Sequence, residues 1–437
     1  MEWHLILLVL LGTLVALMAL GLPVVFAFFA TNLIGAWVFM GGENGVLQLV
    51  RNAVDSVQNF ALLPIPLFIL MGEIMFHTGV AGRAIDAVDK LIARVPGRLS
   101  LVAIVGGTIF SSLSGSTIAN TAMLGSTLLP EMYRRGYKPS IAIGPIVAVG
   151  GIAMLIPPSA LAVLLGSIAQ IPISELLIAS ILPALILAAL FFLYVIVRCW
   201  RNPALAPPYD IARLSWSERL APFVKYVLPL SGIFVVVVGS IFAGLATPTE
   251  SAALGAAATL VAAAAYRRLN WLNFKVAIRQ TLRFTVMTLF IICGSITFSQ
   301  VMAFSQASTG LTQAILGTGL GSTELLIGML LILLFLGCFM DQVSMMMITV
   351  PLFMPLVQQL GLDPVWFGVL MLLVLEISLA TPPFGLLLFV AKGASPETSM
   401  RDIVLSVTPF IGLALLVVAL LIVVPQLTLL LPAMIAR

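Results

Sequence analysis

Long apolar runs constrain this chain more than any other feature of its sequence. Residues 5–20, 227–243, 325–336 and 403–424 are predominantly aliphatic or aromatic, and a helix of about 20 apolar residues crosses the roughly 30 Å hydrocarbon core of a bilayer. The 437-residue chain is 61% hydrophobic and 9% charged, whereas a soluble protein has about 25% charged residues. The sequence therefore predicts an all-α protein that crosses the membrane many times.

The positions of lysine and arginine predict how the chain is oriented. We treat the segments near 99–133 and 325–360 as hairpins that enter and leave the membrane on the same side. All 21 basic residues except Arg51 and Arg437 then fall on one side, and the positive-inside rule assigns that side to the cytoplasm. This arrangement predicts an N-terminus outside the cytoplasm, which is the periplasm if the membrane is a bacterial inner membrane, and two re-entrant helical hairpins.

Helix-shaping residues recur at a single offset of 225 positions. The pairs are Pro23 and Pro248, Pro130 and Pro355, Gly136 and Gly361, Pro139 and Pro364, Pro157 and Pro382, and Pro158 and Pro383. The charge pattern gives the two copies opposite orientations, which is typical of secondary transporters built from inverted repeats. We expect a first repeat over 1–198, a cytoplasmic linker over 199–225 and a second repeat over 226–437.

Polar residues interrupt the apolar pattern at equivalent places in the two copies. The stretch "SSLSGSTIAN" (Ser111–Asn120) is equivalent to "LFLGCFMDQV" (Leu334–Val343). Backbone that leaves a helix at membrane depth must be buried in protein or line a polar cavity, because lipid cannot satisfy its hydrogen bonds. We therefore place each stretch at the tip of a hairpin.

A Pro-Pro pair follows each tip, within helices expected at about 139–171 and 364–391. Two prolines remove two backbone donors and open the preceding turn, so upstream carbonyls become available to a small cation. The pattern predicts two broken helices and one sodium site per repeat. A single pair, Pro157-Pro158 or Pro382-Pro383, is equally compatible with a simple kink.

Four acidic residues lie in apolar surroundings. Asp341 is expected to be functional, since charged groups at membrane depth usually are, although a structural, hydrogen-bonded role stays open. Glu250 is expected to cap a helix. Glu376 is left open between a protonated, a paired and a structural group, and Glu73 receives no assignment.

Other features narrow the function classes. The stretches 45–59 and 267–283 mix charged and apolar residues and predict amphipathic helices at the membrane interface. The glycines of "GTGLGSTE" lack the Gly-Lys-Ser/Thr of an ATP-binding loop, and no nucleophile–base set suggests an enzyme. The formal charge of +4 follows from the orientation pattern and does not indicate nucleic-acid binding.

Five motifs, in order along the chain, resemble the large membrane subunit of TRAP (tripartite ATP-independent periplasmic) transporters. They are "SGSTIANTAMLGSTLLPEMYRRGY" (Ser114–Tyr137), "AMLIPPSALAVLLGSIA" (Ala153–Ala169), "GLATPTESAALGA" (Gly244–Ala256), "GCFMDQVSMMMITVPLFMPL" (Gly337–Leu356) and "ATPPFGLLLFVAKG" (Ala380–Gly393). The resemblance implies an elevator-type sodium symporter of a bacterial or archaeal inner membrane. It also implies two partners, a small four-helix membrane subunit and a periplasmic substrate-binding protein, and an organic acid as substrate.

The resemblance further implies the site residues. The first sodium site would comprise Ser112, Ser114, Ser116, Gly151, Leu155 and Pro157, and the second Gly337, Asp341, Leu379 and Thr381. We expect Ser116, Asn120, Asp341 and Thr381 to face the substrate. The alternatives are a self-sufficient sodium- or proton-coupled anion carrier or antiporter of similar fold, and a membrane scaffold or receptor without transport.

Overall fold

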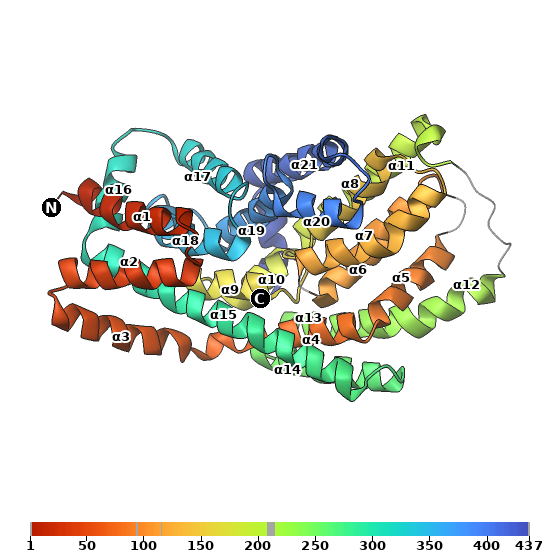
Figure 1. Ribbon diagram of the computed structural model, residues 1–437, viewed down its shortest axis with the longest axis horizontal. Helices are drawn as coiled ribbons and strands as arrows, with labels where there is room; N and C mark the ends of the chain where they lie inside the picture. The colour runs from red at the N-terminus through yellow and green to blue at the C-terminus, as the bar shows by residue number, and fades with distance from the viewer. Residues whose placement is uncertain (1, 93–94, 115, 208–214, 436–437) are drawn as a thin grey trace.

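A computed structural model describes residues 2–92, 95–114, 116–207 and 215–435 (Figure 1). These residues form helices and connecting turns, with no strand among them. The α-helices are α1 (Trp3–Ala19), α2 (Val24–Phe39), α3 (Glu43–Val57), α4 (Pro64–His77), α5 (Val80–Leu91), α6 (Arg98–Ser114), α7 (Thr117–Arg134), α8 (Pro139–Gly150), α9 (Ala160–Ala169), α10 (Ile173–Ala179), α11 (Ile181–Arg201), α12 (Trp216–Pro222), α13 (Leu228–Phe242), α14 (Pro248–Ala265), α15 (Trp271–Phe304), α16 (Ala307–Leu316), α17 (Ser322–Leu336), α18 (Gln342–Gln359), α19 (Pro364–Ala380), α20 (Leu386–Ala394), α21 (Met400–Val423) and α22 (Gln426–Ile435). The all-α prediction is confirmed.

Many of these helices suit a membrane. Within the described chain, five helical segments are long and apolar enough to span a bilayer: Phe60–His77, Ile173–Arg201, Trp216–Phe242, Trp271–Phe304 and Met400–Val423. Several shorter apolar helices, including α8, α9, α17 and α19, accompany them. Those short helices are the parts of the chain that the sequence assigns to hairpins and broken helices.

The packing contacts define two groups of helices. In Figure 1, α3, α4, α14 and α15 run through the lower part of the view, where α4 packs against both α14 and α15, and α15 also packs against α2 and α3. In the other group, α8 packs against α6, α7 and α21, and α19 packs against α17, α18 and α21. The interrupted segments thus belong to the second group.

Helix bounds recur with the same offset as the prolines. α7 and α18 begin and end 225 positions apart, and so do the starts of α8 and α19. Proline fits the first turn of a helix, where no donor is needed, and Pro139 and Pro364 hold that position. Gly136 and Gly361 adopt the left-handed φ values of +78° and +64°, a conformation that favours glycine after a helix end.

The two copies differ where amphipathic interface helices were expected. Residues 43–57 form the separate helix α3, but 267–283 do not form one, because residues 271–283 are the first part of the 34-residue helix α15. The first copy has Pro64 at the start of α4, whereas the equivalent residue is Leu289, so nothing forces a break. The segment expected as a linker up to residue 225 is also helical from Trp216 onward.

Candidate ion and substrate site

The first hairpin consists of α6 and α7, and Ser116 lies at its tip, directly before α7. Ser116 is the N-cap of α7, where its hydroxyl accepts a hydrogen bond from the Ala119 N–H at 3.3 Å. Such a cap satisfies a backbone donor that has no partner within the helix. The side chains of the predicted ligands Ser112 and Ser114 lie outside the described residues, so the tip is represented here by Ser116 and Thr117.

The second hairpin consists of α17 and α18, and Asp341 takes the position equivalent to Ser116. Its Oδ1 accepts hydrogen bonds from the N–H groups of Val343 (3.0 Å) and Ser344 (3.1 Å), and its Oδ2 accepts one from the Ser344 hydroxyl. The structural, hydrogen-bonded role left open for Asp341 is therefore observed, since it caps α18, and its functional role stays a prediction.

Each tip lies against the broken helix of its own repeat. A Cβ on Gly337 would come 1.9 Å from the Ser378 hydroxyl oxygen, so glycine allows the second tip to touch α19. The Cys338 thiol donates to the carbonyl of Pro382 at 3.3 Å. In the first repeat, a Cβ on Gly150 would come 2.0 Å from the Thr121 hydroxyl oxygen, which brings α8 against α7.

The breaks supply unused backbone oxygens. Residues 151–159 separate α8 from α9, and 381–385 separate α19 from α20. No donor among the described residues bonds to the carbonyls of five predicted ligands, which are Gly151, Leu155, Pro157, Gly337 and Leu379. A Cβ added to Gly385 would come 2.6 Å from the Leu379 carbonyl oxygen and 2.8 Å from the Thr381 carbonyl oxygen, so both oxygens lie close to Gly385. These oxygens fit a hard cation, which prefers oxygen ligands.

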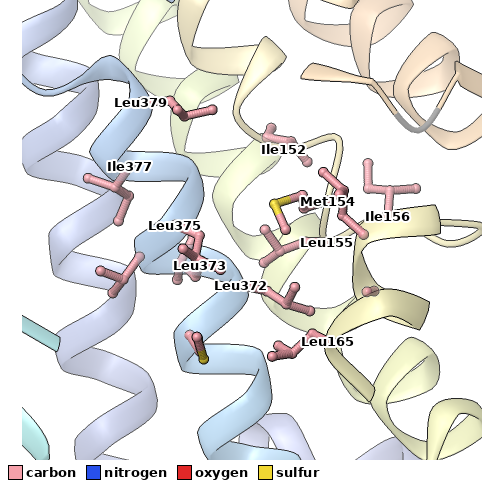
Figure 2. Close-up of a cluster of buried hydrophobic side chains, with 14 of the residues drawn as sticks. Ile152, Met154, Leu155, Ile156, Leu165, Leu372, Leu373, Leu375, Ile377 and Leu379 are labelled. Atoms are coloured by element: carbon pink, nitrogen blue, oxygen red, sulfur yellow. The ribbon is translucent and has the colours of Figure 1, made fainter. Parts of the chain in front are cut away.

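Apolar packing holds the first break in place. Figure 2 shows Ile152, Met154, Leu155 and Ile156 of the break together with Leu372, Leu373, Leu375 and Leu379 of α19. All these side chains are buried in the main core. The break of the first repeat, residues 151–159, therefore packs against α19, which is the broken helix of the second repeat.

Glu376 connects the same two segments through polar contacts. Its side chain is buried, with 1% of the residue exposed. Oε1 accepts a hydrogen bond from the Thr117 hydroxyl at 2.7 Å and another from the Met154 N–H at 3.1 Å. Sequence reasoning left this residue open, because its partners lie 259 and 222 positions away.

A cavity of about 220 Å³ lies between the two tips on one side and helices α4 and α15 on the other. Four helix N-termini adjoin it: those of α7 (Ser116–Ile118), α9 (Ala160, Leu161), α18 (Asp341–Val343) and α20 (Leu386). Its opposite wall comes from Ile69 and Glu73 of α4 and Phe284 and Met287 of α15. Glu73 also pairs with His77 at 3.1 Å.

Two of the four residues expected to face the substrate line this cavity, namely Ser116 and Asp341. Asn120 does not: it is fully buried, and its amide donates to the Ser111 hydroxyl and the Gly107 carbonyl, so it holds α6 and α7 together. Thr381 is not part of the lining either, because its hydroxyl donates to the Ile377 carbonyl at 2.8 Å. Leu379 lines the cavity in its place.

Glu250 has the role expected of it. It forms a capping box with Thr247 at the start of α14, in which the Glu250 carboxylate accepts the Thr247 N–H at 2.8 Å. This reciprocal pattern satisfies two donors that a helix start leaves free. The prediction that Glu250 caps a helix is confirmed.

Solved structures with this fold are membrane transporters. The YdaH transporter of Alcanivorax borkumensis aligns with a TM-score of 0.63 over 88% of this chain and 89% of its own, at 17% identity. MtrF of Neisseria gonorrhoeae, described as one of a class of antimetabolite efflux pumps, aligns with a TM-score of 0.59 over 87% of this chain and 84% of its own, at 16% identity. At these identities the comparison establishes the fold alone.

Proteins related in sequence identify the family of this chain, which the solved structures do not. The ectoine TRAP transporter large permease TeaC of Halomonas elongata is 30% identical over 96% of this chain and 97% of its own, and the ectoine/5-hydroxyectoine permease UehC of Ruegeria pomeroyi is 32% identical over 95% and 96%. The sialic acid permease SiaM of Vibrio cholerae is 28% identical over 94% and 95%. Residues 11–427 match the family "Tripartite ATP-independent periplasmic transporter, DctM component". The chain belongs to this family of large TRAP permeases, as the motifs predicted.

Proposed function

We propose that this chain is the membrane subunit through which a small organic acid is imported together with sodium. The observation that carries the proposal is the composition of the 220 Å³ cavity between the two tips. Relatives with the same architecture are named for ectoine, C4-dicarboxylate and sialic acid transport. Each of these substrates carries a carboxylate, so we assign the organic-acid class to this chain.

The cavity can hold an anion without a basic side chain. Four helix N-termini adjoin it, and the N–H groups and dipole of a helix start favour negative charge. Among the described lining residues the charged side chains are Glu73 and Asp341, with no lysine or arginine. A carboxylate substrate therefore needs cations to offset these acids, and the unbonded carbonyls at the breaks offer such cations oxygen ligands.

The two helix groups support an elevator movement. Both tips and both breaks belong to one group, whereas α4 and α15 form the opposite wall of the cavity. We propose that the group containing the tips and the breaks moves against α4 and α15 and carries the substrate across the membrane. A small membrane subunit and a periplasmic binding protein complete the transporter, with the N-terminus of this chain in the periplasm.

Reconstitution tests this function. Proteoliposomes should contain this chain, the small subunit and the binding protein, with a radiolabelled organic acid outside. We expect uptake that rises cooperatively with external sodium and stops when potassium replaces it or when the binding protein is omitted. Uptake driven by a proton gradient without sodium would contradict sodium coupling, and uptake by this chain alone would support a self-sufficient carrier.

A further inference from the structure

The two repeats distribute their carboxylates unequally. Position for position at the offset of 225, Ser116 corresponds to Asp341, and Gly151 corresponds to Glu376. The second tip therefore carries its own acid, whereas the first tip has a hydroxyl. The acid beside the first tip is Glu376, which comes from α19 of the second repeat. Both acids thus belong to the second repeat.

The residues that begin α7 and α18 are equivalent but make different contacts, because only one of the two repeats has a glutamate at the position of Glu376. Thr117 begins α7, and its equivalent Gln342 begins α18. Thr117 donates to Glu376 at 2.7 Å, but Gln342 has only Gly151 at the equivalent place. The Gln342 amide donates to the Met154 sulfur at 3.0 Å and also interacts with the Glu376 side chain, and Met154 donates its N–H to Glu376.

Glu376 also has a fixed relation to the second site. It lies on the continuous helix α19, which ends at Ala380, and the carbonyl of Leu379 lies three residues further along that helix. A Cβ on Gly151 would come 3.8 Å from both the backbone oxygen and Oε2 of Glu376. The first break therefore lies directly beside Glu376. Displacement of α19 would therefore shift elements of both sites.

We propose that Glu376 is a positioning residue that holds the first tip and the first break on one carboxylate oxygen and thereby makes occupation of the two ion sites interdependent. Because this role presupposes sodium coupling, it deepens the proposed function. An ion at the second site fixes the end of α19, and Glu376 then holds Thr117 and Met154 in place for the first site. Favourable interaction between two sites is a coupling free energy, observed as cooperativity.

The test uses the full-length chain with its small subunit and two measurements. One is the sodium dependence of thermal stability of the purified complex, and the other is the sodium dependence of uptake with the binding protein. Thr117→Val removes one donor at nearly constant volume, and Glu376→Met removes the acceptor. We expect both to raise the half-saturating sodium concentration in both measurements, by about three- to tenfold, and to bring the Hill coefficient towards one.

Two variants separate this role from general damage. Glu376→Gln keeps an acceptor oxygen for Thr117 and Met154, so we expect it to stay within about twofold of the wild type. Thr349→Val is the matched control, because Thr349 is as buried as Thr117 but, among the residues that the structure describes, its hydroxyl bonds only to the Met345 carbonyl in its own helix. It should leave the sodium dependence unchanged.

The outcomes are distinct. Wild-type behaviour of Thr117→Val in both measurements overturns the role of Glu376 while leaving sodium coupling intact, and so does equal damage by Glu376→Gln and Glu376→Met. A wild-type complex that does not respond to sodium overturns the proposed function itself, and this inference with it. If Glu376→Met does not fold, Thr117→Val decides alone.

Discussion

The two hairpin tips have equivalent positions but different chemistry. Ser116 and Asp341 are both N-caps, of α7 and α18, and both line the central cavity. The second tip satisfies its helix start with a carboxylate, whereas the first does so with a hydroxyl and receives a carboxylate from Glu376 across the repeat boundary. The two tips therefore share a helix-start backbone arrangement, whereas the carboxylate beside each tip comes from a different helix.

The strongest test of this comparison concerns the relative orientation of the repeats. Lys138 and Asp363 are equivalent N-cap positions of α8 and α19, and inverted repeats place them on opposite sides of the membrane. Single cysteines at these positions should label all-or-none with a membrane-impermeant maleimide from opposite faces. The native cysteines Cys199, Cys293 and Cys338 are buried, so background labelling should be low. Labelling of both positions from the same face would rule out inverted repeats.

The next largest effect is expected where the second tip touches α19. In Gly337→Ala, the added Cβ would overlap the Ser378 hydroxyl oxygen and its Cβ, at 1.9 and 2.2 Å. Overpacking of this kind costs about 1–3 kcal/mol or more, and here it also displaces the tip. We expect a lower melting temperature and a loss of uptake of at least about tenfold, with the double variant Gly337→Ala, Ser378→Gly restoring part of both. Normal uptake by Gly337→Ala would show that the contact is not required.

A smaller effect is expected from the charge at the second tip. Asparagine caps helices about as well as aspartate, so Asp341→Asn removes the charge and keeps the cap. The half-saturating sodium concentration for uptake should rise on the order of tenfold, equivalent to about 1.4 kcal/mol. Asp341→Ser, which copies the residue of the first tip, should have a similar effect. Unchanged sodium dependence in both variants would reduce Asp341 to a helix cap.

The sequence was sufficient for the elements that depend on local signals. Pro139, Pro364 and the Pro-Pro pairs mark helix starts and breaks because proline acts within a few residues of itself. The split between α3 and α4, and its absence in α15, could have been foreseen from Pro64 and its equivalent Leu289 by the same rule. These features follow from backbone chemistry alone.

Side-chain direction at the sites could not be foreseen in this way. Asn120 follows the first tip closely, yet its amide turns into the hairpin towards Ser111. Glu376 reads as one acid in an apolar helix, and its partners Thr117 and Met154 come from the other repeat. Such contacts depend on how distant helices pack, and one sequence carries no local signal for them.

The smallest effect is expected from a carboxylate that resembles Asp341 only in its helix-start position. Glu250 caps α14 through Thr247 and is exposed to solvent, and it does not line the cavity between the tips. Glu250→Gln keeps an oxygen for the Thr247 N–H, because glutamine also serves in capping boxes. We expect the half-saturating sodium concentration to stay within about twofold of the wild type, since a solvent-exposed charge outside the cavity contributes little. If Glu250→Gln shifted the half-saturating sodium concentration as much as Asp341→Asn does, any acidic residue at a helix start would have this effect. The effect of Asp341→Asn could then not be assigned to its position at the tip.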